Sequence, residues 1–229
     1  LAKDFVMIGN SMFTCSKDVI CPLGDRVEAY VKENDSGDSV VYAFTSERSS
    51  VTYIYSGEKP IYSNGKLTYC NDKQKEYTLY ADTTVSVVYN GKAFENCRDE
   101  DFSIGSGHIE AVDNNNDGRI DLFRIYESSF CVVESYDIYR NVIYDLNRLT
   151  NVSLGEDVIY DADFDVKGLK NGDVLEVYKS LDVKCIKLLL LKERVSGVID
   201  EVSESGKIVI SGKEYDTSNY LWKTAQILL

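Results

Sequence analysis

Hydrophobic and polar residues alternate with a period of two along most of the chain, and this pattern constrains the fold more than any other feature. Residues 26–31, 84–87 and 207–210 are typical runs, short and rich in β-branched or aromatic residues. Glycine-containing turns that tolerate positive φ angles separate such runs: Asp35-Ser36-Gly37, Asn64-Gly65, Asn90-Gly91, Asp117-Gly118, Asn171-Gly172, Ser205-Gly206 and Ser211-Gly212. The 17 tyrosines suit pleated surfaces, and no stretch keeps a helical period for four turns. The sequence therefore predicts an all-β fold.

One stretch of the chain recurs. Residues 23–30 (Leu-Gly-Asp-Arg-Val-Glu-Ala-Tyr) return as residues 171–178 (Asn-Gly-Asp-Val-Leu-Glu-Val-Tyr), and an apolar strand ending in Glu-Arg follows each copy. The second copy continues at once into a predicted hairpin at residues 197–210. The matching hairpin of the first copy, residues 107–125, comes only after about fifty intervening residues that carry two Asn-Gly turns of their own. Short alternating strands also match each other by chance, but the shared Gly-Asp and Glu-x-Tyr favour a true repeat.

The repeat predicts the organisation of the chain. We expect two small barrel- or sandwich-like β modules in series, residues 1–150 and residues 151–229. The first module is interrupted by an inserted β-hairpin subdomain at residues 51–105, since insertions enter at exposed loop tips. The second module is expected to be truncated.

The two ends of the sequence suggest a piece of a longer polypeptide. The chain opens at Leu1 without an initiator methionine, and residues 208–215 resemble residues 5–13, as if a further module were starting. Modules in series bury their ends against neighbours. We therefore expect five apolar side chains near the end to be poorly covered or packed against another molecule: Leu221, Trp222, Ile227, Leu228 and Leu229.

The charge and the cysteines exclude several functions. With 25 basic and 38 acidic residues, the net charge of −13 repels phosphate backbones and argues against nucleic-acid binding. No apolar run approaches the roughly 20 residues that cross a bilayer, so no membrane insertion is expected. The six cysteines form no Cys-x-x-Cys pair, and we expect buried thiols rather than a zinc or redox site.

Several short motifs carry a family resemblance. The order Leu-Gly-Asp-x-Val-Glu-x-Tyr from Leu23, Val-Tyr-Asn-Gly-Lys at residues 88–92 and the Asp/Asn-rich run at residues 107–121 is similar to the β-rich regions of cell-envelope proteins from Gram-positive anaerobes that carry surface-layer homology modules. The Ser-Gly-Val-Ile and Ile-Ser-Gly-Lys-Glu-Tyr stretches within residues 195–215 fit those regions too. The resemblance implies an exported, cell-surface-associated protein. Its expected partners are neighbouring modules of the same polypeptide or cell-wall components, and it gives no catalytic residues.

An Asp/Asn-rich turn is the strongest chemical motif. Asp113, Asn115, Asp117 and Asp121 match positions one, three, five and nine of a calcium loop, with Gly118 at the sharp turn. Position twelve is an arginine where a bidentate glutamate should close the shell, so weak binding is expected. Calcium is the one cofactor that the sequence suggests, and the alternative is a hairpin turn whose side chains cap their own amides.

No catalytic arrangement is recognisable. His108 is the only histidine, its neighbours alternate as a strand, and no Gly-x-Ser-x-Gly nucleophile motif or phosphate-binding loop occurs. Asp161, Asp163 and Asp165 share one face of an extended run, which we interpret as a solvated face rather than a cation site. We expect a protein that is not an enzyme.

Three functional hypotheses remain, of which an enzyme of unrecognised type is the least favoured because of the lone histidine and the missing motifs. The first is a non-enzymatic structural or interaction segment of an exported protein. The second is a glycan- or protein-binding module in which tyrosine-rich strands form a stacking platform. The candidate aromatic groups are Trp222 with Tyr220, Tyr53 with Tyr55, and Tyr62 with Tyr69, although such clusters more often belong to a core or a cross-strand pair. A large pocket lined by aromatic rings and carboxylates would favour the second hypothesis.

Overall fold

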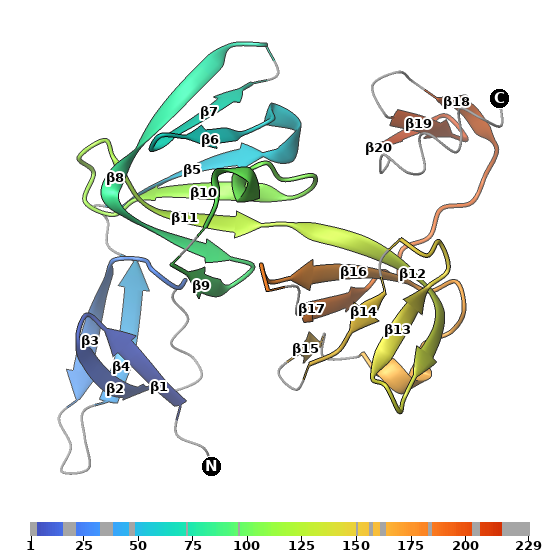
Figure 1. The fold of residues 1–229 in the computed structure, drawn as a ribbon, viewed down its shortest axis with the longest axis horizontal. Helices are drawn as coiled ribbons and strands as arrows, with labels where there is room; N and C mark the ends of the chain where they lie inside the picture. Colours follow the sequence, from blue (N-terminus) through green and yellow to red (C-terminus); the bar gives the residue numbers. More distant parts are fainter. Residues whose placement is uncertain are drawn as a thin grey trace. The chain divides into compact units, whose positions relative to one another are not determined.

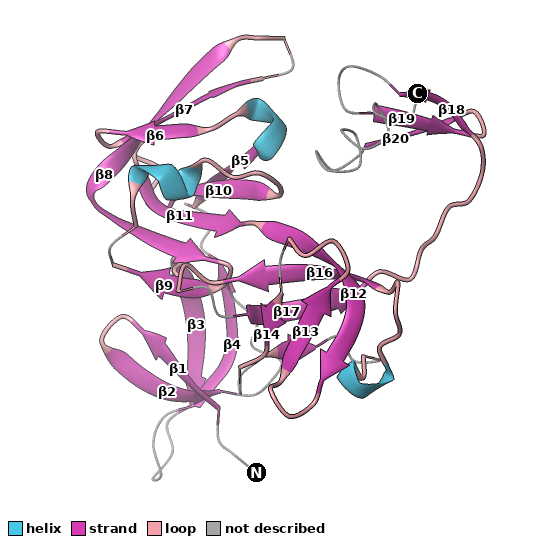
Figure 2. Cartoon of the chain, turned by 45° about the vertical axis from the view of Figure 1, so that its right-hand side comes forward, coloured by secondary structure: helices cyan, strands magenta, loops and turns pink. Residues whose placement is uncertain are grey.

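The computed structural model describes residues 4–15, 22–32, 39–45, 49–71, 73–95, 97–149, 151–155, 158–160, 164–182, 185–202 and 207–216. In these ranges the chain forms the strands β1 to β20 and three short 3-10 turns, η1 (Ser56–Glu58), η2 (Asp99–Phe102) and η3 (Val166–Gly168), with no α-helix (Figure 2). The prediction of an all-β fold is confirmed. No helix in these ranges has the length and apolar character needed to cross a membrane.

The chain divides into a larger unit, Leu1–Leu190, and a smaller one, Leu191–Leu229. The larger unit begins with a four-stranded sheet in the order β1-β2-β4-β3 (Figure 1). Its strands are β1 (Asp4–Ile8), β2 (Ser11–Cys15), β3 (Val27–Lys32) and β4 (Ser39–Thr45).

The second sheet of the larger unit has the order β5-β10-β11-β8-β7-β6, with β9 added beside β8. Its strands are β5 (Ser50–Tyr55), β6 (Ile61–Ser63), β7 (Lys66–Cys70), β8 (Glu76–Tyr89), β9 (Lys92–Phe94), β10 (His108–Asp113) and β11 (Ile120–Tyr126). The strands of the predicted insertion, β5 to β9, therefore share one sheet with β10 and β11, and β11 pairs with β8 in parallel. Pairing between strands this far apart in the chain carries no local sequence signal.

The third sheet of the larger unit has the order β14-β13-β12-β16-β17-β15. Its strands are β12 (Ser128–Asp137), β13 (Val142–Asp145), β14 (Val152–Ser153), β15 (Ile159–Tyr160), β16 (Val174–Lys179) and β17 (Cys185–Leu190). Figure 1 shows β11 running on into β12, so that one long, bent stretch of chain joins the second and third sheets. The predicted module boundary after residue 150 falls inside this sheet, between β13 and its partner β14. That residues 1–150 and 151–229 are two copies of one β module stays a prediction.

The two hairpins of the repeat pair in the same way. β3 and β4 are antiparallel in the register Val27↔Thr45, and β16 and β17 are antiparallel in the register Leu175↔Leu190. Each ladder shifts register directly after its tyrosine, Tyr30 in the first copy and Tyr178 in the second. The same irregularity at the same step supports a shared local structure for the two stretches.

The turns before the two hairpins also match. Gly24 and Gly172 have φ angles of +88° and +84°, which L-amino acids with a side chain rarely adopt. In each turn the following aspartate, Asp25 or Asp173, donates its backbone N–H to the carbonyl oxygen three residues earlier. The repeated Gly-Asp pair is thus a turn signal.

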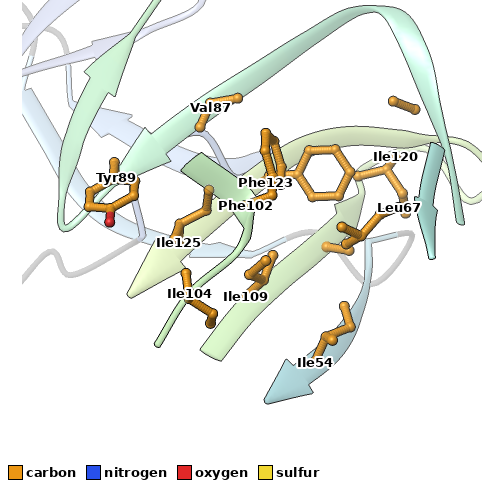
Figure 3. Close-up of a cluster of buried hydrophobic side chains, with 12 residues drawn as sticks. Ile54, Leu67, Val87, Tyr89, Phe102, Ile104, Ile109, Ile120, Phe123 and Ile125 are labelled. Carbon is orange, nitrogen blue, oxygen red and sulfur yellow. The ribbon is translucent and has the colours of Figure 1, made fainter. Parts of the chain in front are cut away.

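Among the described residues, two large hydrophobic clusters and a small one (Val88, Val112 and Leu122) form the core of the larger unit. In the second sheet, Figure 3 shows Phe102, Phe123 and Leu67 converging from η2, β11 and β7, and the two phenylalanine rings meet edge-on at 5.1 Å. In the third sheet the buried residues come from β12, β13, β14, β16 and β17: Cys131, Val133, Ile143, Val152, Leu175, Val177 and Leu188. The inward positions alternate along β13 and along residues 174–177 of β16, as the period of two predicts, whereas β11 is buried at four consecutive positions, from Leu122 to Ile125.

The smaller unit contains an antiparallel sheet in the order β18-β19-β20, formed by β18 (Ile199–Val202), β19 (Lys207–Ile210) and β20 (Lys213–Asp216). Gly197 lies against the side chains of Ile210 and Ser211, where a Cβ atom would clash. The predicted exposure of Leu221, Trp222, Ile227, Leu228 and Leu229 lies outside the described residues, and so does the Trp222 and Tyr220 pair.

Candidate ligand-binding cleft

A cleft of about 530 Å³ opens where the second and third sheets meet, beside the passage of β11 into β12. The second sheet contributes His108 and Tyr126, and the third contributes Phe130, Glu176 and Tyr178. This volume is within the range of small-molecule sites, and the lining combines aromatic rings with a few polar groups.

Asn90 fixes the two sheets to each other at the cleft. Its side-chain Nδ2 donates to the carbonyl oxygens of Glu127, at 2.8 Å, and Lys179, at 2.6 Å. Its Oδ1 accepts from the backbone N–H of Glu127 at 2.9 Å. Asn90 is buried in the Asn-Gly turn between β8 and β9, so a side chain of the second sheet makes two hydrogen bonds to the backbone of Glu127, between β11 and β12, and one to Lys179 on β16 of the third sheet.

The bend between β11 and β12 is held from its other side. The carboxylate of Glu127 accepts a hydrogen bond from the Tyr89 hydroxyl, and its Oε1 accepts one from the backbone N–H of Gly105 at 2.7 Å. Burial, followed by the hydrogen bond to Glu127, raises the pKa of Tyr89 well above its ordinary value. The hydroxyl therefore stays protonated and donates to Glu127 at the bend between β11 and β12.

Glu176 is the carboxylate on the third-sheet side of the cleft. Its Oε1 accepts from Ser128 Oγ at 2.7 Å and from the Tyr178 hydroxyl at 3.0 Å. Burial, followed by the neighbouring Glu176, raises the pKa of Tyr178, which keeps that hydroxyl protonated. Lys187 Nζ lies 5.5 Å from the centre of the Tyr178 ring. Both donors bind the same oxygen, so the carboxylate is oriented while Oε2 accepts no hydrogen bond from a residue that the structure describes.

His108 stands among tyrosines on the second-sheet side. Its ring stacks on Tyr126 with centroids 4.9 Å apart, and the rings of Tyr53 and Tyr55 on β5 are each 5.9 Å away. His108 Nε2 is 3.5 Å from Glu110 Oε1. The sequence identified both His108 and the Tyr53/Tyr55 pair but gave no reason to place them together.

The other predicted aromatic group belongs to the core and to a strand pair. Tyr62 stacks on Phe102 at 4.2 Å, and Tyr69 stacks on its cross-strand neighbour Tyr77 at 5.5 Å. Neither ring lines the cleft. Tyr62 therefore belongs to the core and Tyr69 to a cross-strand pair, which is the alternative that the sequence left open for tyrosine clusters.

The Asp/Asn-rich turn lies between β10 and β11. The carboxylate of Asp113 accepts backbone hydrogen bonds from four residues of the turn, Asn115 (3.2 Å), Asn116 (2.6 Å), Asp117 (3.2 Å) and Gly118 (2.8 Å). This is the self-capping turn that the sequence offered as the alternative to a calcium loop.

The other predicted calcium ligands take part in the same network. Asn115 Oδ1 accepts from the Asp117 N–H at 2.9 Å, and Asp121 Oδ2 accepts from the Asn114 N–H at 2.7 Å. Across the described ranges, the structure groups no three His, Cys, Asp or Glu side chains in a way that could hold a metal ion. Calcium binding at Asp113, Asn115, Asp117 and Asp121 stays a prediction.

The remaining sequence-based candidates lie elsewhere. Asp165 caps η3, since its Oδ1 accepts from the Lys167 N–H at 3.0 Å, while Asp161 and Asp163 lie outside the described residues. Among the described cysteines, Cys70, Cys97 and Cys131 are free thiols, and Cys131 is fully buried.

Sequence reasoning missed Glu176 and Phe130 as residues of the cleft. The Glu-x-Tyr pattern of the repeat was a usable signal, because residues two apart on a strand share one face. The pairing of Phe130 with Glu176 across β12 and β16 had no such signal, since the two residues are joined only by the register of distant strands.

No family model, no curated protein and no solved structure matches the chain. The described residues form an all-β fold with an aromatic-lined cleft between its second and third sheets.

Proposed function

We propose that this chain is a non-enzymatic binding module that holds a carbohydrate in the cleft between its second and third sheets. The observation that carries the proposal is the combination of Tyr126, Phe130 and Tyr178 with the oriented carboxylate of Glu176 in one concave site. The apolar faces of sugar rings pack on aromatic rings, and their hydroxyl groups donate to an ionised carboxylate.

The charge of the chain favours a neutral ligand. At a net charge of −13 the protein repels anions as they approach, while the cleft itself is lined by one carboxylate, Glu176, and one ammonium group, Lys187. A neutral sugar avoids the long-range repulsion and can still donate to the carboxylate of Glu176.

The arrangement of carboxylates supports binding rather than hydrolysis. Glycosidases generally place two carboxyl groups across the scissile bond, one as acid and one as base or nucleophile. Among the described residues that line the cleft, Glu176 is the only one with a carboxylate. Glu110, near His108, is instead engaged by Arg124, whose Nε lies 2.6 Å from its Oε2.

The resemblance to cell-envelope proteins supports a location for this function. We propose that the chain is an exported, cell-surface-associated segment. Its partners would be neighbouring modules of the same polypeptide or cell-wall components, of which a neutral wall glycan fits the cleft. A segment with this role links and spaces other modules while binding the wall.

The proposal can be tested by titrating the protein with neutral hexasaccharides of glucose and of N-acetylglucosamine in a calorimeter. We expect at least one to bind, and Phe130→Ala to weaken binding about tenfold through loss of a stacking surface. The matched control is Tyr139→Ala, an aromatic residue that is 97% exposed in the turn after β12. If every hexasaccharide fails to bind, or if both variants lose affinity equally, the cleft is not a sugar site. Release of shortened sugars during incubation would show an enzyme instead.

A further inference from the structure

The second sheet carries four aromatic rings on one face, next to the cleft. We call Tyr53, Tyr55, His108 and Tyr126 the aromatic shelf. His108 is its centre, with ring centroids 4.9 Å from Tyr126 and 5.9 Å from each of the other two tyrosines. The strand register explains the arrangement, because His108 pairs with Tyr55 on one side and Tyr126 on the other.

The shelf is continuous with the cleft and extends beyond it. His108 and Tyr126 line the cleft, whereas Tyr53 and Tyr55 do not. These two tyrosines lie on β5, at the edge of the sheet, and are 53% and 58% exposed. A ligand that fills the cleft and continues past His108 would therefore lie directly over them.

A buried ion network lies beside the shelf. On the same face, Arg124 is buried between Glu110 and Asp25, with its Nε 2.6 Å from Glu110 Oε2. Glu110 is also 3.5 Å from His108 Nε2, so the ion network contacts the ring at the centre of the shelf. The ring of His108 is thus positioned by Glu110 and by its stacking on Tyr126, and ligand binding does not have to order it first.

We infer that the aromatic shelf is a second subsite, and that the ligand of the cleft is a linear, neutral oligosaccharide that extends from the cleft over Tyr55 and Tyr53. This inference rests on the proposed carbohydrate function and specifies which class of carbohydrate binds. The rings offer successive stacking surfaces with polar edges, which suits a chain of sugar units. The net charge of −13 disfavours an anionic chain.

The inference is tested by a length series together with a double substitution. The probes are the disaccharide and the hexasaccharide of whichever sugar binds in the experiment above. In the unmodified protein we expect the hexasaccharide to bind at least tenfold more tightly than the disaccharide. In Tyr53→Ala/Tyr55→Ala we expect the hexasaccharide to lose about tenfold, for two stacking contacts, while the disaccharide keeps its affinity.

Tyr30→Ala/Tyr42→Ala is the matched control, because these two tyrosines are also exposed, at 67% and 59%, and also neighbours, with centroids 6.3 Å apart. We expect this control to bind both probes normally. Equal affinities of the disaccharide and hexasaccharide, unchanged in Tyr53→Ala/Tyr55→Ala, would overturn the shelf as a subsite and leave the cleft as a sugar site.

A failure of the whole carbohydrate function would look different. No hexasaccharide would bind the unmodified protein, so the affinities of the disaccharide and the hexasaccharide could not be compared. β5 is an edge strand, and extended peptides add to such edges. Binding of unfolded, carboxymethylated lactalbumin that is lost in Tyr53→Ala/Tyr55→Ala would make the shelf a protein-docking surface and would overturn it as a sugar subsite, and the absence of any hexasaccharide binding would overturn the cleft as a sugar site.

Discussion

Arg124 on β11 forms a buried ion pair with Asp25, a residue of the Gly-Asp turn that lies ninety-nine positions earlier in the chain. Glu110 on β10 is the second partner of Arg124, with its Oε2 2.6 Å from Arg124 Nε. The first sheet and the second sheet are therefore joined by an ion network whose arginine and aspartate side chains are about 95% buried. Next to it, Gly24 lies against Leu122, where a Cβ atom would meet the leucine side chain at 2.7 Å.

Removal of Asp25 tests this junction. We expect Asp25→Ala to lower the free energy of unfolding by about 3 to 5 kcal/mol, because Arg124 keeps its buried charge and loses one of its two partners. Lys92→Ala removes a more exposed ion pair, with Asp182 at 2.8 Å, and should cost at most about 1 kcal/mol. Urea denaturation of both variants gives the comparison. Similar costs for the two substitutions would mean that the buried network does not hold the first sheet in place.

The role of Asn90 gives a second prediction with a close control. Asn90 and Asn64 are the first residues of two Asn-Gly hairpin turns and have φ angles of 49° and 51°. Only Asn90 makes three hydrogen bonds outside its own turn, two to Glu127 between β11 and β12 and one to Lys179 on β16, whereas the Asn64 side chain donates to the adjacent Ser63. We expect Asn90→Ala to destabilise the protein by about 3 kcal/mol more than Asn64→Ala, at about 1 kcal/mol for each lost bond. Thermal and urea unfolding measure this difference, and equal values would show that the amide bridge contributes nothing.

Turn chemistry was the part of the fold that the sequence predicted best. Asn64-Gly65 and Ser211-Gly212 form the two-residue hairpin turns expected of them, with positive φ angles at both positions. Such turns depend on the residues within them, so a local pattern is sufficient evidence. The repeated Gly-Asp turn was found for the same reason.

The assignment of strands to sheets could not be predicted. β11 pairs in parallel with β8, Phe123 facing Val87, whereas the sequence placed residues 107–125 in a hairpin of the first module and β8 in the inserted subdomain at residues 51–105. The candidate site could not be predicted from the sequence for the same reason. His108 and the pair Tyr53/Tyr55 were recognised as residues, but their meeting depends on the register of β5 with β10. Glu176 was found only as part of a repeat, because its partner Ser128 is 48 residues away.

The buried thiol of Cys131 predicts how stability depends on pH. Burial, followed by the nearby Asp145, raises the pKa of Cys131 from 9.0 to about 11. Between these values the thiol ionises in the unfolded chain but not in the folded one. Its contribution to stability is therefore complete below pH 9 and is lost as the pH rises towards 11.

Comparison of the unmodified protein with Cys131→Ala isolates this effect. From pH 8 to pH 10 we expect the unmodified protein to lose about 1.4 kcal/mol more than the variant in its free energy of unfolding. The variant is less stable at pH 8 because it leaves a cavity, but only the change with pH is compared. Parallel losses in the two proteins would contradict the raised pKa.

The Asp/Asn-rich turn makes the last prediction, on calcium. Asp113 accepts four backbone hydrogen bonds, so the turn is closed by its own residues. We therefore expect the domain to stay folded in chelator. A site with a dissociation constant of about 0.1 to 1 mM, typical of weak extracellular calcium sites, adds about 0.4 to 1.4 kcal/mol at 1 mM calcium.

Two substitutions separate the metal from the turn. Asp117→Ala removes a predicted calcium ligand whose Oδ1 otherwise accepts the Arg119 N–H at 2.9 Å, so it should abolish the calcium increment and change stability in chelator by only about 1 kcal/mol. Asp113→Ala should lower the unfolding temperature in chelator as well, because four amides lose their acceptor. Thermal unfolding of the three proteins with and without calcium decides between these roles. Unfolding of the whole domain in chelator would show that the turn depends on a metal, because the hydrogen bonds of Asp113 would then be too weak to close it alone.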